Sequence, residues 1–442
     1  MSCQRTLGLF SDRQLYSLCD RAGIPRDRTE SGEVSRAMDD ARAIGRRVRY
    51  WRQRRNLGRK QFADMVGRSV SWLDKIEIGE RNLLRLPMLE RVAAALAIDP
   101  TVLTDAQVAS SAAQCADGVE VQSIKQALGR YPMLSADYGH GRAVTNAQVE
   151  RQLSYAGQAW LSSHFAVVAG VLPSLIEDAQ RLVAESEEDV RRQAHRALVM
   201  AYRLACSMLL KYDSTEIGWL AADRALYTAQ SSQDEIALAR ATRSVARAMS
   251  HTGQLDAAVT VSIDMAERLR PRLNDDDRDA MPLFGMLLLS AEIAAAKRDD
   301  AGLAEALHED ASTKAERLGP AHRGHHTIFG PANVGAHRVA ALVRLRQGDA
   351  AVRYAQRLDP AMVNAMPVER RANLLLDLTD AHTQIGRYDA AIRALIQADR
   401  LAPEEVRCRP LARRLIVGLL STRPGGRHDG LRHVAQLAGV AA

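Results

Sequence analysis

Residues 61–81 read QFADMVGRSVSWLDKIEIGER, and this stretch decides the fold of the N-terminal region. Apolar residues recur at spacings of three and four on both sides of Gly67, which predicts two short helices, Arg59–Val66 and Val70–Ile78. Gly67 permits a tight turn and a close approach of the two helices, and Ser69 is well placed to cap the second one. Two helices joined by a short turn form the helix-turn-helix arrangement.

The flanking sequence supplies two more helices. Upstream, Ile44, Val48 and Trp51 give a first helix its buried face, and downstream Pro87–Leu96 supplies a fourth helix. We therefore expect a compact domain of short helices over residues 41–104. The other faces of the first helix carry arginines, some of which we expect to add to a basic field and others to be solvated surface: Arg46, Arg47, Arg49, Arg52, Arg54 and Arg55.

The net charge of the chain is confined to this domain. Residues 41–103 hold 14 basic and six acidic side chains, a balance of +8, whereas residues 1–40 have a balance of −1. The remaining 339 residues hold 40 side chains of each sign, so the overall charge of +7 belongs to one segment. This distribution predicts a polyanion as the partner of that segment.

The same stretch resembles the XRE family of helix-turn-helix repressors over about 60 residues. The turn glycine, the cap and the core positions match together, at Ala63, Gly67, Ser69, Leu73, Ile76, Glu77 and Gly79. Two residues depart from the family pattern: Gly58 replaces the usual capping Ser or Thr, which would fray the helix at Arg59–Val66 slightly, and Arg68 replaces a small apolar residue.

The resemblance implies that the helix Val70–Ile78 reads double-stranded DNA in the major groove. The residues that it places at base edges are Val70, Ser71, Trp72, Asp74 and Lys75. The residues that it places at phosphates are Arg59, Ser69, Arg81 and Arg85. Packing against the preceding helix is an equal alternative for Trp72. One module covers a single half-site, so a homodimer on an inverted repeat is expected.

Residues 146–442 alternate helix-forming segments with short Gly, Asp or Pro breaks, without the period-two pattern of strands. Two units, Leu238–Pro271 and Asn373–Pro403, resemble the tetratricopeptide (TPR) repeat, a helix pair of about 34 residues. Weaker units lie at Leu204–Gln230, Gly285–Gly319 and Ala340–Pro360. The prediction is an all-α protein whose second part is a TPR-like α-solenoid, the alternative being a generic helical bundle. Residues 105–145 read as a linker containing one helix, Val119–Leu128, and residues 1–40 as a flexible or partly helical arm.

Composition excludes several other classes of protein. The longest apolar stretches, Phe165–Ile176 and Met281–Ala296, are interrupted and too short for a clean membrane span. The five cysteines are scattered without pairing, and no hydrophobic signal core opens the chain, so we expect a cytoplasmic protein with no disulfide framework, no resident metal and no cofactor.

The segment Ala321–His337, AHRGHHTIFGPANVGAH, differs from its surroundings and suggests an effector site. Pro331 would begin a helix whose first amides could receive an anion. Candidate effector contacts are His325, His326, Thr327, Phe329, Asn333 and His337. A structural turn is an even alternative. A metal site using His322 with His325 or His326 is less favoured, and a catalytic pair of Thr327 with His326 is supported by nothing else.

An XRE-like module joined to a TPR-like array is similar in architecture to bacterial regulators of the Rgg and PlcR type, and similar FGPANV-like loops occur in XRE regulators of high-GC bacteria. The resemblance implies an array that dimerises and binds a peptide or small molecule, which changes the spacing of the two DNA modules. The hypothesis is a DNA-binding transcriptional regulator and not an enzyme. The alternative is an interaction scaffold whose array captures a protein and whose DNA contact is secondary.

Overall fold

The computed structural model describes residues 41–53, 55, 57–83, 85–96, 98, 100–104, 118–130, 144–274, 279–319 and 328–440. Every regular element in these ranges is a helix, so the predicted all-α class is confirmed. The predicted arm at residues 1–40 lies outside the described residues.

The N-terminal domain packs short helices around one apolar core. A helix at residues 41–53 is followed by four others, α3 (Arg59–Val66), α4 (Val70–Glu77), α5 (Leu86–Leu96) and α6 (Thr101–Thr104). The predicted inward faces are confirmed, because the core includes Ile44, Val48, Trp51, Phe62, Val66, Leu73, Ile76, Leu89, Val92 and Leu96.

The rest of the described chain is a long succession of helices. In chain order they are α8 (Gly118–Gly129), α9 (Asn146–Leu161), α10 (Phe165–Glu185), α11 (Glu188–Lys211), α12 (Thr215–Ser231), α13 (Glu235–His251), α14 (Leu255–Leu269), η2 (Arg270–Asn274), α15 (Ala280–Lys297), α16 (Ala301–Leu318), α17 (Pro331–Arg344), α18 (Gly348–Gln356), α19 (Pro360–Ala365), α20 (Val368–Gln384), α21 (Tyr388–Leu401), α22 (Pro403–Arg407), α23 (Pro410–Leu420), η3 (Gly425–Arg427) and α24 (Asp429–Leu437).

These helices pack as antiparallel pairs at the places where the sequence indicates repeats. The pairs α11–α12, α13–α14, α15–α16, α17–α18 and α20–α21 each make extensive contact. Each pair turns through one residue in the left-handed region of backbone conformation, namely Asp213, Gly253, Asp299, Arg346 and Gly386. Only two of these are glycines, which is why glycine alone does not mark every repeat in the sequence.

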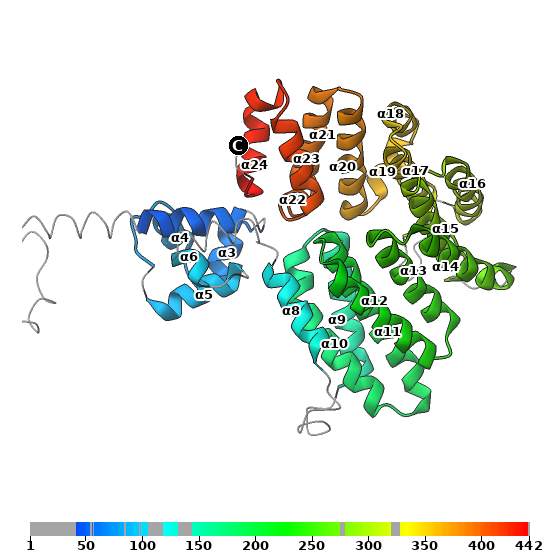
Figure 1. The fold of residues 1–442 in the computed structure, drawn as a ribbon. Helices are drawn as coiled ribbons and strands as arrows, with labels where there is room; N and C mark the ends of the chain where they lie inside the picture. Colours follow the sequence, from blue (N-terminus) through cyan, green and yellow to red (C-terminus); the bar gives the residue numbers. More distant parts are fainter. Residues whose placement is uncertain are drawn as a thin grey trace, which may run out of the picture.

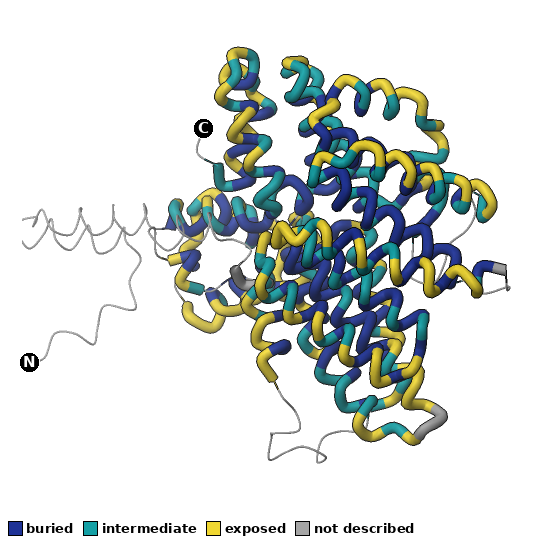
Figure 2. Tube along the Cα trace, turned by 45° about the vertical axis from the view of Figure 1, so that its right-hand side comes forward, coloured by how far each residue is buried: buried dark blue, intermediate teal, exposed yellow. Residues whose placement is uncertain are grey.

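The first helices of the pairs line up as an inner row. Contacts run from α11 to α13, then to α15, α17 and α20, while α12, α14, α16, α18 and α21 pack outside them. Figure 1 shows the curved array that results, and Figure 2 shows the mostly buried character of its middle helices.

The two ends of the array meet. Lys211 Nζ of α11 lies 2.7 Å from Glu369 Oε1 of α20, and the amide of Ala166 donates to Glu404 Oε2 at 2.9 Å. The C-terminal helices therefore return to α9–α11, and the curved array closes on itself (Figure 1).

Helix α15 is long and apolar enough to cross a membrane by length and composition alone, but 83% of it is buried inside the protein. It contacts α13, α14, α16 and α17. Its apolar character therefore follows from its place at the centre of the array, where helices surround it on all sides.

Helix α8 occupies part of the span predicted as a linker. The helix itself was expected from the sequence, but the structure packs it against α10 and buries Ile124, Ala127 and Leu128 in the first core cluster of the array. Residues 118–130 are therefore part of the folded array instead of a free tether. Residues 105–117 and 131–143 of the predicted linker lie outside the described residues.

Candidate nucleic-acid interface

The turn between α3 and α4 is built as the sequence indicates. Gly67 has a φ of 68°, in the left-handed region, and its amide donates to Asp64 O at 3.0 Å. Ser69 is the N-cap residue before α4, and its Oγ accepts a hydrogen bond from the amide of Trp72 at 3.2 Å, which confirms the predicted cap. Gly58 supplies no side-chain cap to α3, yet the helix spans the predicted residues.

One side of α4 remains available to a ligand. Val70, Ser71 and Lys75 are exposed, and Asp74 is partly exposed. Trp72 is half-buried and packs against the domain core, as the packing alternative expected, but it also lines a depression on the surface. The base-reading residues implied by the resemblance are thus brought together on one short helix.

A depression of about 610 Å³ lies at the start of α4, lined by Asp64, Gly67, Arg68, Ser69, Trp72 and Arg81. Unpaired amides at a helix start favour anions, and two arginines stand beside them here. Arg68, noted in the sequence only as a departure from the family pattern, is one of these two. A phosphate group of DNA is the kind of ligand that suits this position.

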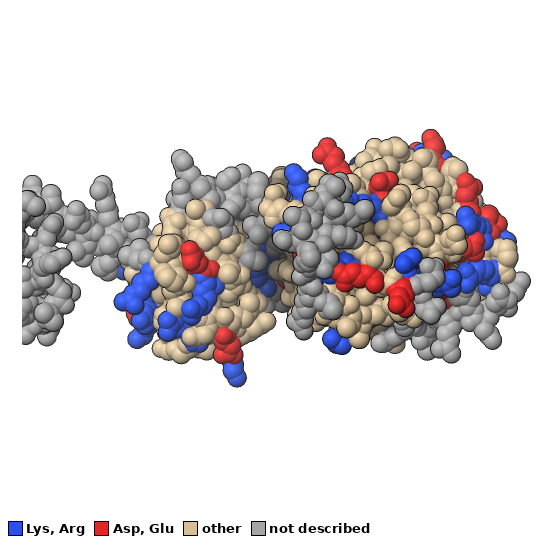
Figure 3. All heavy atoms as spheres, turned by 90° about the horizontal axis from the view of Figure 1, so that it is seen from below, with Lys and Arg blue, Asp and Glu red and all other residues tan. Residues whose placement is uncertain are grey.

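The predicted phosphate contacts Arg59, Arg81 and Arg85 are all exposed. Arg59 Nη1 also lies 3.3 Å from Asp74 Oδ1, which joins α3 to α4 through an exposed ion pair. Figure 3 shows Lys and Arg side chains gathered on the visible face of this domain, with few acidic ones among them. The geometry thus combines an exposed helix face with basic side chains around it, as DNA binding requires.

Two of the arginines predicted on the first helix, Arg52 and Arg55, are not available to DNA, contrary to the expectation that they belong to a basic field or a solvated surface. Arg52 is 7% exposed and pairs with buried Glu77 of α4, with Nε 2.5 Å from Oε1 and Nη2 3.0 Å from Oε2. Arg55 is 4% exposed, and its Nε donates to Leu96 O at 3.1 Å. Both side chains pack their aliphatic stems within the domain while their guanidinium groups bind partners on other elements. Arg54 lies outside the described residues.

The N-terminal domain also touches the array directly. Arg407 Nη1 of α22 donates to Gln53 O at 2.6 Å. The same guanidinium pairs with Asp399 of α21 through Nε at 2.6 Å and Nη2 at 2.7 Å. The sequence gives no signal for this contact, which joins residues 354 positions apart.

The predicted effector residues divide into two groups. His325, His326 and Thr327 lie outside the described residues, as does His322 of the alternative metal site. Phe329 and Asn333 are each 2% exposed, so both act as internal packing here. The Phe329 ring lies against Gly285 of α15, where an added Cβ would come within 2.0 Å of it. Asn333 Nδ2 donates to Ile328 O at 2.6 Å and thereby fixes the entry to α17.

His337 lies one turn after Asn333, and its Nδ1 is 2.8 Å from Asn333 O. Burial, together with repulsion from the nearby Arg370, lowers the pKa of His337 to about 3. The imidazole is therefore neutral at physiological pH. Among the described residues no group of three or more His, Cys, Asp or Glu side chains could hold a metal ion.

Comparison with known proteins agrees with this geometry. A family model described as "Helix-turn-helix domain" matches residues 43–106. No curated protein matches the chain. The matched span covers the helix at residues 41–53 almost entirely, together with α3, α4, α5 and α6. The chain therefore carries a helix-turn-helix domain, which indicates DNA binding and a role in transcription regulation.

Proposed function

We propose that this protein is a sequence-specific transcriptional regulator that binds an inverted repeat as a homodimer, through a base-reading face made of Val70, Ser71 and Lys75. The observation that carries the proposal is the exposed side of α4 beside a basic depression, within a domain that holds the whole positive balance of the chain. Phosphate contacts by Arg81, Arg85 and Arg59 would set the position of α4 on the duplex.

The helical array is the sensor in this proposal, and we assign it to the TPR-like class of the Rgg and PlcR regulators. Its helix pairs, each turning through a left-handed residue, support that assignment. The contact from Arg407 to Gln53 O offers a physical link through which a change in the array reaches the first helix of the DNA domain. A ligand alters DNA affinity only through its different affinity for the two arrangements of the domains.

The salt dependence of DNA binding tests the proposal. Binding of the full chain to genomic duplex fragments should weaken steeply as salt rises, because phosphate contacts release counterions. Arg81→Ala should reduce the slope of log affinity against log salt by about one. Arg353→Ala removes the same charge from the exposed face of α18, where Arg353 pairs with Asp349, and should leave the slope unchanged.

The alternative scaffold, in which the array captures a protein and DNA contact is secondary, predicts a different outcome. A weak complex with no dependence on Arg81 would favour that function. The balance of +8 over residues 41–103 supports the regulator, since a pure scaffold has little use for it.

A further inference from the structure

One stripe of the inner row is rich in cations. Arg203, Ser207 and Lys211 follow one another at four-residue spacing on α11, so they share one face of that helix. Lys211 is the member of the stripe that reaches Glu369 of α20 at 2.7 Å. The stripe therefore faces the interior of the closed array, toward α20.

The neighbouring helix α13 adds two more cations. Arg243 and Arg247 are one turn apart, and Arg247 Nη1 donates to Ser207 Oγ at 2.7 Å. Helices α11 and α13 run in the same direction, because α12 reverses the chain between them. Arg203 lies one turn before Ser207 on α11, and Arg243 lies one turn before Arg247 on α13. Arg203 and Arg243 therefore lie beside each other.

These three arginines make no ion pair with any carboxylate of the residues that the structure describes. Arg243 Nε donates to Met286 O at 3.3 Å, and Arg247 donates to the Ser207 hydroxyl. Arg203 Nε is buried without a hydrogen-bond partner. All three side chains are only partly buried, so they still reach solvent.

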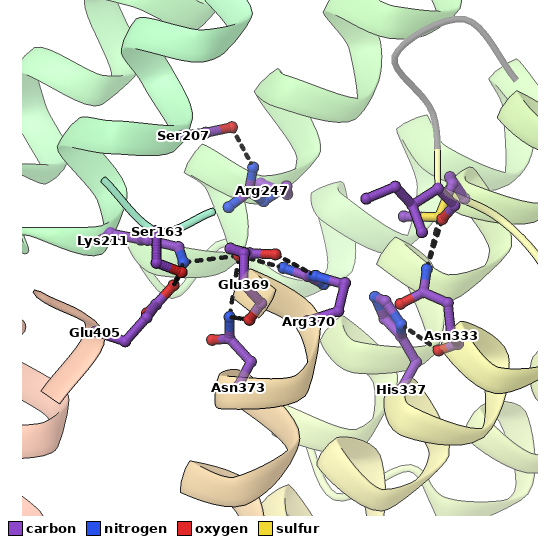
Figure 4. Close-up of polar contacts among 12 residues, drawn as sticks. Ser163, Ser207, Lys211, Arg247, Asn333, His337, Glu369, Arg370, Asn373 and Glu405 are labelled. Atoms are coloured by element: carbon purple, nitrogen blue, oxygen red, sulfur yellow. Dashed lines mark hydrogen bonds and ion pairs between the residues drawn. The ribbon is translucent and has the colours of Figure 1, made fainter. Parts of the chain in front are cut away.

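Two carboxylates on the opposite side of the interior, Glu369 and Glu405, are already engaged (Figure 4). Glu369 Oε1 accepts from Lys211 Nζ, Arg370 Nη2 at 2.6 Å and Asn373 Nδ2 at 3.0 Å. Glu405 pairs with Lys211 and with Arg409, whose Nη1 lies 2.6 Å from Oε2.

The interior therefore holds a local excess of positive charge. Burial, together with repulsion from the neighbouring guanidiniums of Arg240 and Arg247, lowers the pKa of Arg203 to about 10. Burial also holds the pKa of Arg243 well below its ordinary value, with added repulsion from Arg247, Arg203 and Arg370. Cations gathered in this way weaken the fold until an anion joins them.

We propose that Arg203, Arg243 and Arg247 bind a compact small-molecule polyanion, carrying phosphate or several carboxylate groups, on the inner surface of the array. Guanidinium groups recognise both kinds of anion through paired hydrogen bonds. Helices α11 and α13 supply the ligand contacts, and Ser207 positions Arg247. This names the chemical class of the effector and rests on the proposed function only for its consequence at DNA.

Thermal unfolding of the full-length protein tests the site with two probes, pyrophosphate and citrate, against sodium chloride at equal ionic strength. A bound anion stabilises the folded state in a saturable way, so the wild-type midpoint should rise with at least one probe. Pyrophosphate alone would identify a phosphate ligand, citrate alone a polycarboxylate, and both together a site that selects charge.

Three variants decide whether the effect belongs to this site. Arg243→Met and Arg247→Met should each abolish the anion-dependent rise, and Arg243→Met should also raise the midpoint without anion because it relieves repulsion. Arg353→Met loses the same charge from an exposed pair on α18 and should respond as the wild type does.

Hydrogen exchange locates the effect, since the DNA domain also attracts anions. The anion probe should slow hydrogen exchange at the amides of α13 in the wild type but not in Arg243→Met. The proposal is overturned if neither probe gives a saturable rise, or if Arg243→Met and Arg247→Met respond as the wild type does. Either failure leaves salt-sensitive DNA binding untouched, so the two proposals fail separately.

Discussion

The buried ion pair between Arg52 and Glu77 should hold the DNA-binding domain together. It joins the helix at residues 41–53 to α4 through two hydrogen bonds, of 2.5 Å and 3.0 Å, and a third runs from Arg52 Nη1 to Leu57 O at 2.9 Å. Each side chain of the pair is less than a tenth exposed. Glu77→Leu would leave the guanidinium charged and unpaired in the core, which destabilises by about 3–5 kcal/mol.

Replacing both partners should behave differently from replacing one. Arg52→Met with Glu77→Leu removes both charges and fills the space with apolar atoms, an exchange that is often neutral for buried pairs. Among the described residues, the double change leaves Leu57 O without its partner, and this acceptor belongs to a half-buried residue. We expect the free energy of unfolding of the double variant to lie within about 1–2 kcal/mol of the wild-type value. The effects of the two changes on stability are therefore strongly non-additive.

Hydrogen exchange of the full-length protein measures the stability of the DNA-binding domain by itself, because it reports the opening of that domain independently of the array. A loss of about 3 kcal/mol accelerates exchange at the Ile76 amide roughly 100-fold, since 1.4 kcal/mol corresponds to about a factor of ten. The double variant should restore most of the protection. Exchange in Glu77→Leu that is less than about tenfold faster, or a double variant as unstable as the sum of the singles, would refute the reasoning.

Three further predictions follow from the packing and the charges. Phe329→Ala should lower the free energy of unfolding of the array by about 3–5 kcal/mol, measured by denaturant titration, because the ring fills the space against Gly285; a loss below about 1 kcal/mol would contradict this. Ser69→Ala should lower the stability of the DNA domain by about 1 kcal/mol, seen as faster amide exchange in α4, and unchanged exchange would show that the cap is idle. His337 has a pKa of about 3 when folded and an ordinary pKa when unfolded, so the unfolded chain binds the extra proton. The neutral imidazole therefore contributes its full stabilisation above about pH 6.5, and the free energy of unfolding falls by about 1.4 kcal/mol per pH unit below that value. His337→Gln should flatten this part of a curve of stability against pH, and an unchanged slope would contradict the assignment.

The DNA-binding domain could be predicted well from the sequence because the signals for it are local. Helix periodicity, a turn glycine and a capping serine all lie within 61–81, and each depends on neighbours only a few residues away. The buried roles of Arg52 and Arg55 were not visible, because an arginine on a helix reads as surface until its partner on another element is known. Glu77 matched the family pattern, and pairing it with the cations two helices earlier was the signal that could have found this contact.

The array was predictable as helix pairs but not as a closed ring. Breaks at Gly253 and Gly386 mark two turns, whereas Asp213 and Arg346 adopt the same conformation without a glycine to announce it. Closure depends on contacts such as Lys211 with Glu405, which are 194 residues apart and follow no periodicity. The arginine cluster on the inner row was missed for the same reason, since Arg203 lies a whole repeat before Arg243 and Arg247.

The most direct test of the central claim is a map of the genomic DNA bound by the full-length protein, compared with a variant carrying Ser71→Ala and Lys75→Ala. A control variant carrying Ser231→Ala and Lys125→Ala makes the same chemical changes at exposed sites on the array. The account predicts a few sharp sites sharing an inverted repeat, retained in the control and lost when the α4 face is changed. Diffuse binding, or sharp sites that survive the α4 changes, would contradict it.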